Sequence, residues 1–330
     1  MKSIQLGNTE IYVSKVGYGC MGLSHAFGTP LTEEEAIQKI HAAYNAGYRY
    51  FDTAECYTGI DETGNIVYNE EVVGKGIKDF RKDIILATKF GVKMTATELL
   101  TDSSPETIRK SLEGSLKRLG TDYVDLYYQH RIDPNVEPEV VAGVMKELIE
   151  EGKIRAWGIS ELEDEEYLRR ANAVCPVAAV QNMYSLIDRY TESLFPVFEE
   201  LGITMFAYTP LAKGFLSGVY KEKPTFKDSQ DFRGGRLQFS EGGFDYYNQA
   251  IDLIRQLADE KKATLAQISL AWMMNKTTKI IPIPGTRTES RMIENANASE
   301  VVLTPEEVKA IDDALNKLNL TDTASQWRGY

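Results

Sequence analysis

The sequence contains few of the residues that stabilise small secreted proteins or bind metal ions. Its 330 residues include three cysteines and three histidines, which cannot form a closed disulfide set and are not spaced like metal ligands. Acidic side chains outnumber basic ones by 49 to 37, and the net charge of −12 argues against nucleic acid and anionic membrane surfaces as partners. No apolar run has the length of a membrane span, and no leader-like segment opens the chain. We therefore expect a cytoplasmic protein without a metal site; the sequence indicates no particular oligomeric state.

What the sequence does contain is a regular alternation of short apolar runs and amphipathic segments. Hydrophobic residues make up 43% of the chain, enough for a large core without disulfides. Helix starts are marked by a capping box from Thr32 to Glu35, by Ser104-Pro105, and by Thr304-Pro305. Strand candidates between the helices begin near Val13, Tyr48, Ile84, Tyr123, Ile154, Val177, Ile203 and Lys279.

These eight successive strand–helix units predict an α/β fold, a (β/α)8 TIM barrel formed by residues 1–330 as a single domain. An open doubly wound sheet is the alternative, because periodicity alone does not exclude it. Two segments fall outside the repeat. Met1 to Tyr12 predicts a hairpin around Gly7-Asn8 that plugs the amino end of the barrel. Pro210 to about Tyr246 is a long loop after strand seven, either a functional lid or a disordered insertion.

The glycines near the start spell a nucleotide-binding fingerprint. Gly17, Gly19 and Gly22 have the G-x-G-x-x-G spacing of a Rossmann unit. That motif needs its third glycine inside a starting helix, because the pyrophosphate lies on the helix N-terminus. Here the next helix starts only after Thr32. We therefore interpret this segment as a loop and predict that the cofactor binds elsewhere.

Four polar residues stand at or just beyond the carboxyl ends of strand candidates: Asp52, Tyr57, Lys89 and His130. Each has an ordinary explanation. Asp52 could cap a turn, and Tyr57 is one of 18 tyrosines. Lys89 could be solvated and His130 could be a core histidine. Because functional groups of α/β folds gather at the carboxyl ends of the strands, we predict that the four share one site.

Together these four side chains suit the reduction of a carbonyl group. Hydride transfer builds negative charge on the carbonyl oxygen, where a proton must then be delivered. Tyrosine is a weak acid with a pKa near 10, and a nearby cation such as Lys89 lowers that pKa by roughly 1–3 units. Asp52 would fix Lys89, and a neutral His130 would donate a hydrogen bond to the substrate oxygen. The sequence therefore predicts Tyr57 as a general acid.

Eight segments spread over nearly the whole chain share one family pattern. They are GCMG (19–22), FDTAECY (51–57), ATKFG (87–91), DLYYQH (125–130), GKIRAWGIS (152–160), VQNMY (180–184), YTPLAKGFL (208–216) and IPGTR (283–287). In this order they resemble the aldo-keto reductases, in particular a bacterial NADPH-dependent branch. The resemblance implies a (β/α)8 barrel, a catalytic tetrad of Asp52, Tyr57, Lys89 and His130, and a nicotinamide cofactor held without a Rossmann fold.

The resemblance also assigns residues to the cofactor. Matching positions are Ser160 and Gln181 for the carboxamide, Tyr208 for stacking on the nicotinamide ring, and Leu211, Lys213 and Gly214 for the pyrophosphate. Asn182 adjoins the carboxamide residues. Ala212 stands where the family often has glycine. For Tyr208 alone, ordinary core packing is the alternative to stacking.

A phosphate site can be predicted from the residues near the C-terminus. Gly285, Thr286 and Arg287 lead from a strand into a helix that carries Arg291, Glu294 and Asn295 in its first turns. Backbone N–H groups at a helix start and guanidinium groups both suit phosphate. Two arginines in an acidic chain predict binding of a 2′-phosphate, hence NADPH over NADH. Ordinary surface arginines on a solvated helix are the alternative.

The substrate is predicted to be a small carbonyl compound. The expected pocket wall comprises Cys20, Met21, His25 and Phe27, the stretch Thr58 to Tyr68, the long loop, and the aromatic tail residues Trp327 and Tyr330. This lining favours apolar or aromatic aldehydes and ketones. Two other functions stay open: an NADP(H)-binding regulatory subunit with little turnover, and a lyase that uses Lys89 as a Schiff-base nucleophile.

Overall fold

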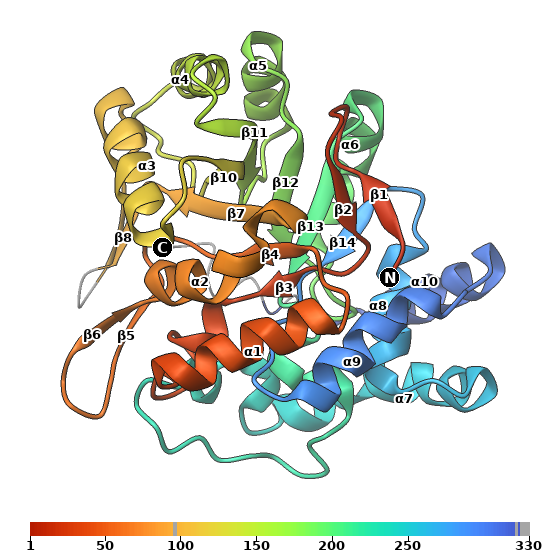
Figure 1. Ribbon diagram of the computed structural model, residues 1–330. Coiled ribbons are helices and arrows are strands. Elements are labelled where there is room, and N and C mark those ends of the chain that lie inside the picture. Colours follow the sequence, from red (N-terminus) through yellow and green to blue (C-terminus); the bar gives the residue numbers. More distant parts are fainter. Residues whose placement is uncertain (95–97, 321–322, 324–330) are drawn as a thin grey trace.

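Parallel strands at the centre of the molecule form one curled sheet (Figure 1). The computed structural model describes residues 1–94, 98–320 and 323. Eight strands pair in chain order, each parallel to its neighbours. They are β3 (Tyr18–Gly19), β4 (Tyr50–Asp52), β7 (Ile85–Phe90), β10 (Val124–Gln129), β11 (Ile154–Ser160), β12 (Ala179–Met183), β13 (Thr204–Tyr208) and β14 (Ile280–Pro282). The predicted barrel is confirmed, and the alternative of an open doubly wound sheet is wrong.

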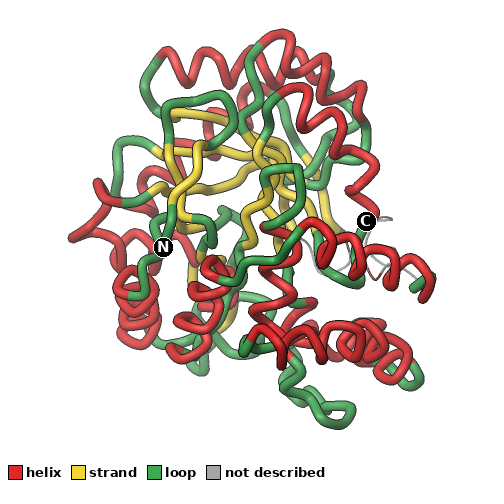
Figure 2. The backbone as a smooth tube through the Cα atoms, turned by 90° about the vertical axis from the view of Figure 1, so that its right-hand side faces the viewer, coloured by secondary structure: helices red, strands yellow, loops and turns green. Residues whose placement is uncertain are grey.

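Helices surround the strands on the outside of the sheet (Figure 2). They are α1 (Glu33–Asn45), α2 (Asn69–Ile77), α3 (Pro105–Leu119), α4 (Pro138–Glu150), α5 (Glu165–Val174), α6 (Phe195–Leu201), α7 (Gly243–Lys261), α8 (Leu265–Met274), α9 (Glu289–Asn297) and α10 (Pro305–Leu318). The predicted capping box of Thr32 and Glu35 starts α1. Ser104 caps α3, and Thr304 caps α10. No helix in the described part of the chain is long and apolar enough to cross a membrane.

The glycines of the false fingerprint join the two ends of the sheet. Gly17 N donates to Pro282 O at 2.9 Å, so the chain entering β3 meets β14 and the barrel closes. A Cβ built on Gly19 would lie 2.8 Å from Ile283 O, and one on Gly285 would lie 2.6 Å from Gly19 O. Such contacts are too short for any side chain. Gly19 and Gly285 thus allow the two backbones to come into contact. The interpretation of the segment as a loop is confirmed, because a short 3-10 turn, η1 (Met21–Leu23), follows β3 in place of an α-helix.

The N-terminal hairpin fills the amino end of the barrel as predicted. Strands β1 (Ser3–Gln5) and β2 (Tyr12–Ser14) pair antiparallel, and Gly7 N donates to Thr204 Oγ1 at the start of β13. Val13 is buried with the apolar side chains inside the barrel. The expectation that Val13 begins the first barrel strand is therefore wrong. Its alternating pattern does form a strand, but the partner is β1, and the first barrel strand is β3.

Three excursions extend beyond the barrel. Two are antiparallel hairpins, made of β5 (Thr58–Ile60) with β6 (Ile66–Tyr68) and β8 (Val92–Met94) with β9 (Leu99–Thr101). The third is the long connection from β13 to α7, which we call the lid loop (residues 209–242); it contains η4 (Ala212–Ser217), η5 (Phe232–Gly235) and η6 (Leu237–Phe239). It is folded against its neighbours: the Gln230 side chain exchanges two hydrogen bonds with the backbone of Ile60, at 3.0 and 2.9 Å.

The close approach of β3 and β14 predicts that a side chain at Gly19 destabilises the protein, and a glycine with open space around it serves as the control. Gly19→Ala should lower the free energy of unfolding by roughly 1–3 kcal/mol, because the new methyl group overlaps a backbone carbonyl. Gly143→Ala is the control, since Gly143 lies within α4 with open space around its Cα, and should raise stability by roughly 0.5–1 kcal/mol. Urea unfolding measures both; a Gly19→Ala protein as stable as the wild type would contradict the packing described.

Candidate active site

The fold brings all four predicted tetrad residues together at the mouth of the barrel. Asp52 ends β4, and Lys89 lies on the neighbouring strand β7. His130 follows β10, and its backbone N–H donates to Phe90 O of β7 at 3.0 Å. Tyr57 lies in the turn after β4, where its backbone N–H donates to Ala54 O at 3.2 Å. Adjacent parallel strands thus position three of the residues, and one tight turn positions the fourth.

The Lys89 ammonium group is fully buried and bound on three sides. Its Nζ donates to Asp52 Oδ1 at 2.6 Å, to Thr53 O at 2.8 Å and to Tyr57 Oη at 3.3 Å. These contacts use all three hydrogens of the ammonium group. The second carboxylate oxygen of Asp52 accepts a 2.8 Å hydrogen bond from Gln181 Nε2. Lys89 and Asp52 are therefore held in one orientation toward Tyr57.

Burial and charge act in opposite directions on this cluster. Burial disfavours the Lys89 ammonium, but Asp52 and Tyr57 outweigh it and raise the pKa of Lys89. Burial raises the pKa of Tyr57 to about 12, although Lys89 acts to lower it. The expectation of a net lowered Tyr57 pKa is therefore wrong: the cation acts in the predicted direction, but desolvation is the larger effect. Tyr57 is a protonated phenol at neutral pH.

His130 is held in its neutral form. Burial, followed by repulsion from Lys89, lowers its pKa well below the ordinary value. Its ring meets Tyr57 edge-on with centroids 5.7 Å apart. Its Nδ1 lies 3.5 Å from Cys56 Sγ, and burial raises the pKa of that thiol to about 12. Because a neutral imidazole has one N–H, His130 can donate a single hydrogen bond to a ligand beside Tyr57.

The predicted carboxamide residues are neighbours across two strands. Ser160 of β11 and Gln181 of β12 are paired in register, and both are buried. Asn182 has a different role: its amide bonds the backbone of Leu162 in both directions, at 3.0 and 2.7 Å. Tyr208 ends β13, and burial raises its pKa well above the ordinary value. Ser160, Gln181 and Tyr208 thus line consecutive strand ends beside the tetrad.

The start of the lid loop has a backbone that favours glycine. Ala212 and Lys213 have φ values of 46° and 59°, and Gly214 has 91°. Left-handed backbone costs a residue with a Cβ roughly 1–2 kcal/mol. Ala212 and Lys213 thus adopt a backbone conformation that glycine would adopt without this cost. Leu211 immediately precedes the 3-10 turn η4.

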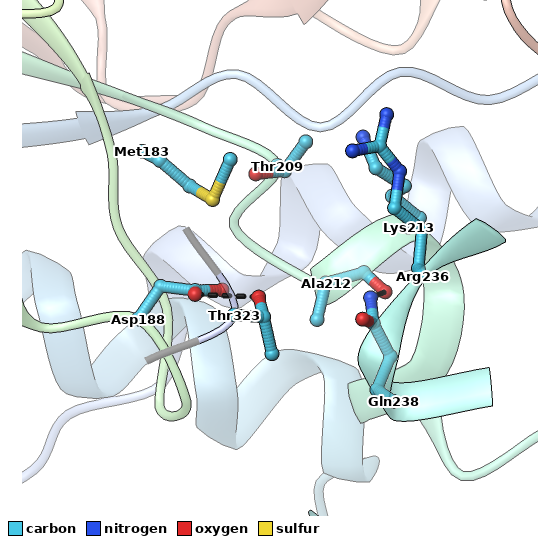
Figure 3. A pocket seen from close by; sticks show the side chains of 8 residues that line it. All are labelled: Met183, Asp188, Thr209, Ala212, Lys213, Arg236, Gln238 and Thr323. Carbon is cyan, nitrogen blue, oxygen red and sulfur yellow. Dashed lines mark hydrogen bonds between the residues drawn. The ribbon is translucent and has the colours of Figure 1, made fainter. Parts of the chain in front are cut away.

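Two half-buried cationic side chains, Lys213 and Arg236, line a small pocket at this turn (Figure 3). Burial, followed by repulsion from Arg236, lowers the pKa of Lys213 to about 7. Burial likewise lowers the pKa of Arg236 to about 10. Across the pocket, Thr323 Oγ1 donates to Asp188 Oδ1 at 2.5 Å. The charged side chains among the lining residues are two basic groups, Lys213 and Arg236, and one acidic group, Asp188, a balance that suits an anion, and we call this site the anion pocket.

The sequence did not reveal several residues that line this pocket. The remaining members are Met183, Thr209 and Gln238. Thr209 Oγ1 and Gln238 Oε1 are buried, and no described residue offers either a hydrogen-bond partner. Arg236 and Gln238 stand in the lid loop, which lacks any periodic pattern. Only an expectation that a lid carries cations toward the mouth could have singled out Arg236.

The predicted phosphate end lies beside the first loop. Tyr18 Oη of β3 donates to Thr286 O at 2.8 Å, and Gly285 approaches Gly19. Arg287 Nε donates to Gly22 O at 2.6 Å, while its Nη2 is buried with no partner among the described residues. The Nε atom of this guanidinium therefore fixes the first loop, whereas Nη2 is available to bind a ligand.

The other residues predicted at this end belong to α9. Arg291 is exposed on its first turn, and Glu294 is half-buried with its backbone carbonyl accepting from Gln267 Nε2 at 3.1 Å. Asn295 is buried, and none of the described residues bonds its Oδ1. Thr288, which precedes the helix, makes no side-chain cap. The N–H groups of Glu289 and Ser290 therefore have no side-chain cap, whereas the N–H groups of Arg291 and Met292 both donate to Thr288 O at 3.1 Å.

The pocket wall differs in one respect from the expectation. Cys20 is fully buried in the hydrophobic core and cannot contact a ligand at the mouth. Met21, His25 and Phe27 remain half-exposed on the first loop. His25 stacks on Tyr57 with ring centroids 5.7 Å apart. Trp327 and Tyr330 lie outside the described residues.

Comparison with known proteins identifies the same pattern over most of the chain. A family model described as the aldo/keto reductase family matches residues 15–316. A "probable aldo-keto reductase 1" of Glycine max is 37% identical over 320 residues, 96% of this chain and 89% of that protein. "Aldo-keto reductase str7" of Strobilurus tenacellus is 35% identical over 310 residues, 91% of this chain and 88% of that protein. The solved glycerol dehydrogenase AKR11B4 of Gluconobacter oxydans superposes with a TM-score of 0.84 at 27% identity, covering 97% of this chain and 96% of that one.

The buried ion pair predicts a large and specific stability effect. Lys89→Met should lower the free energy of unfolding by roughly 3–5 kcal/mol, because it leaves the Asp52 carboxylate buried without its cation. The double variant Asp52→Asn/Lys89→Met should lose less than the sum of the two single losses. Thermal and urea unfolding provide the measurement.

A matched control for this effect lies on α10. Lys309 and Asp313 form a pair at the same 2.6 Å separation, but both side chains are largely exposed. Lys309→Met should have the same free energy of unfolding as the wild type, within experimental error. Equal losses for Lys89→Met and Lys309→Met would contradict the role assigned to burial.

Proposed function

The chain belongs to the aldo/keto reductase family, and we propose that it reduces aldehydes and ketones with NADPH, using Tyr57 as the general acid. Membership of the family indicates an oxidoreductase that acts on small carbonyl substrates with a nicotinamide cofactor. The choice of NADPH, the site residues and their roles are our proposal. Its main support is the buried Lys89 ammonium, which contacts Tyr57 Oη while paired with Asp52.

When bound, a nicotinamide cofactor would supply the hydride that the carbonyl carbon accepts. Tyr57 donates its phenolic proton to the carbonyl oxygen as negative charge develops there, which yields the alcohol. Lys89 stabilises the phenolate left behind, and Asp52 with Gln181 keeps Lys89 oriented. Neutral His130 donates a hydrogen bond to the same oxygen and so fixes the carbonyl for transfer. Solvent returns a proton to Tyr57 after the product leaves.

The residues at the carboxyl ends of the strands suit the binding of a nicotinamide dinucleotide that carries a 2′-phosphate. Ser160 and Gln181 would hold the carboxamide, and Tyr208 would stack on the ring. Lys213 with Gly214 and Leu211 would bind the pyrophosphate, and Arg236 would add a second cation there. Support comes from buried polar atoms without partners among the described residues, Thr209 Oγ1, Gln238 Oε1, Arg287 Nη2 and Asn295 Oδ1, which a bound nucleotide could satisfy.

Preference for NADPH rests on the phosphate end. Arg287 and Arg291 stand at the N-terminus of α9 with Gly285 and Thr286 before them, which suits a 2′-phosphate. Glu294 and Asn295 on the same helix would face the adenosine. A Schiff-base lyase is disfavoured, because the raised pKa of Lys89 keeps its amine protonated and not nucleophilic.

The role of Tyr57 can be tested by removing one hydroxyl group. Tyr57→Phe should lower kcat for 4-nitrobenzaldehyde by roughly 10²–10⁴-fold, because the general acid is lost while the ring is kept. Binding of NADPH, followed by quenching of protein fluorescence, should persist. Unchanged turnover in Tyr57→Phe would sink the assignment. Binding of NADPH without turnover of any carbonyl by the wild type would favour a regulatory subunit.

The cofactor preference can be tested at the two arginines. Arg287→Ala and Arg291→Ala should each raise the KM for NADPH by roughly 10–100-fold, the effect of losing a charge-assisted hydrogen bond, with little change for NADH. Measuring both cofactors in each variant separates phosphate binding from general damage to the first loop. A wild-type preference for NADH that survives Arg287→Ala would defeat the proposal.

A further inference from the structure

A second histidine lies against the proposed general acid. The His25 ring stacks on Tyr57 with centroids 5.7 Å apart and an angle of 17°. On its other side it meets Phe232 of the lid loop edge-on at 5.6 Å. His130 also contacts Tyr57, so two imidazoles flank the phenol. The proposed reaction uses only one of them.

The hydrogen bonding of His25 fixes which nitrogen carries its proton. His25 Nδ1 lies 2.6 Å from Thr58 O, and because a carbonyl oxygen only accepts, Nδ1 must donate. Burial lowers the pKa of His25 below its ordinary value, despite the opposing bond to Thr58, so the ring is neutral at pH 7. Its Nε2 therefore holds a lone pair. No described residue bonds Nε2, and this atom is not among the polar atoms sealed from solvent.

This lone pair differs in kind from the groups that would bind the carbonyl oxygen. Tyr57 and His130 offer hydrogens to that oxygen, whereas His25 Nε2 can only accept one. A ligand that uses it must bring its own donor. A charged ammonium is disfavoured there, because the positive charge of Lys213 already acts on the His25 ring. A neutral hydroxyl group is the donor that fits.

We propose that His25 is a specificity-determining residue whose Nε2 accepts a hydrogen bond from a hydroxyl next to the reacting carbonyl, so that α-hydroxy aldehydes and ketones are the preferred substrates. This inference rests on the proposed carbonyl reduction and narrows its substrate class. The stacking of His25 on Tyr57, with ring centroids 5.7 Å apart, keeps this acceptor beside the proposed general acid. The proposed α-hydroxy carbonyl substrates take the place of the apolar or aromatic substrates that were expected from the residues of the pocket wall alone.

A matched pair of ketones tests the proposal. Hydroxyacetone and butanone have the same number of non-hydrogen atoms, and a hydroxyl in one stands where the other has a methyl. The ratio of kcat/KM for hydroxyacetone over butanone, with NADPH, should fall roughly 10–100-fold in His25→Phe, which keeps the ring stacking but removes both nitrogens. His25→Gln, which offers an amide N–H to Thr58 and a carbonyl acceptor, should restore part of it. The greater reactivity of the hydroxylated ketone cancels, since all three enzymes share it.

An identical ratio in wild type and His25→Phe would overturn the inference while leaving carbonyl reduction intact. Failure of the wild type to reduce either ketone would instead contradict the proposed function, and the inference with it. A second readout needs no turnover. The chain has three histidines, so long-range ¹H–¹⁵N spectra of histidine-labelled enzyme resolve each ring. We expect the Nδ1–H tautomer for His25 near pH 7.5; the Nε2–H tautomer would overturn the inference.

Discussion

The ion pair between Lys89 and Asp52 is the contact on which the rest of the site depends. A buried ammonium is costly in isolation, and burial alone would favour the neutral amine. Asp52 reverses this at 2.6 Å, and Thr53 O and Tyr57 Oη satisfy the remaining hydrogens. Without Asp52, Lys89 would lose the charge that, in the proposed reaction, stabilises a phenolate on Tyr57. The neighbouring strands β4 and β7 supply the two partners, so the geometry of the site follows directly from the parallel register.

Barrel closure connects this centre to the proposed phosphate end. Gly19 follows Tyr18 on β3 and is paired with Asp52 of β4, while its other side meets Gly285. The chain leaving β14 is thereby drawn against the first loop, where Arg287 donates to Gly22 O. Because no side chain separates the two backbones, the first loop and the start of α9 form one unit. The glycine pattern that imitates a nucleotide fingerprint would therefore contribute to the proposed nucleotide binding only indirectly, through packing.

Local signals explain which parts of the fold the sequence could predict. Capping by Thr32, Ser104 and Thr304 involves residues within three positions of the cap, so these helix starts were readable. The first barrel strand could not be predicted in this way. The sequence around Val13 has a strand pattern, but the strand with which it pairs depends on residues elsewhere in the chain. The same distinction holds in the site. Strand-end positions predicted the tetrad cluster, whereas the net pKa of Tyr57 depends on three-dimensional burial that no motif encodes.

Contacts between distant segments also account for what was missed around the lid loop. Asp228 accepts hydrogen bonds from the backbone and side chain of Thr29, at 2.8 and 3.1 Å, and Gln230 bonds Ile60. These partners are far apart in sequence, and the loop has no period that would reveal them. The lid loop carries Lys213 near its start and Arg236 near its end, and it contacts His25 through Phe232.

The same loop therefore joins the anion pocket to the wall around Tyr57. Lys213 lies 6.0 Å from the Phe27 ring and contributes to the lowered pKa of His25. An anion bound at Lys213 would offset the charge that acts on His25, and it would also order the loop that packs on the His25 ring. Because one segment provides both contacts, occupancy of the anion pocket and the shape of the substrate wall cannot vary independently. Under the proposed function, substrate selection would therefore depend on the lid loop as well as on the strand ends.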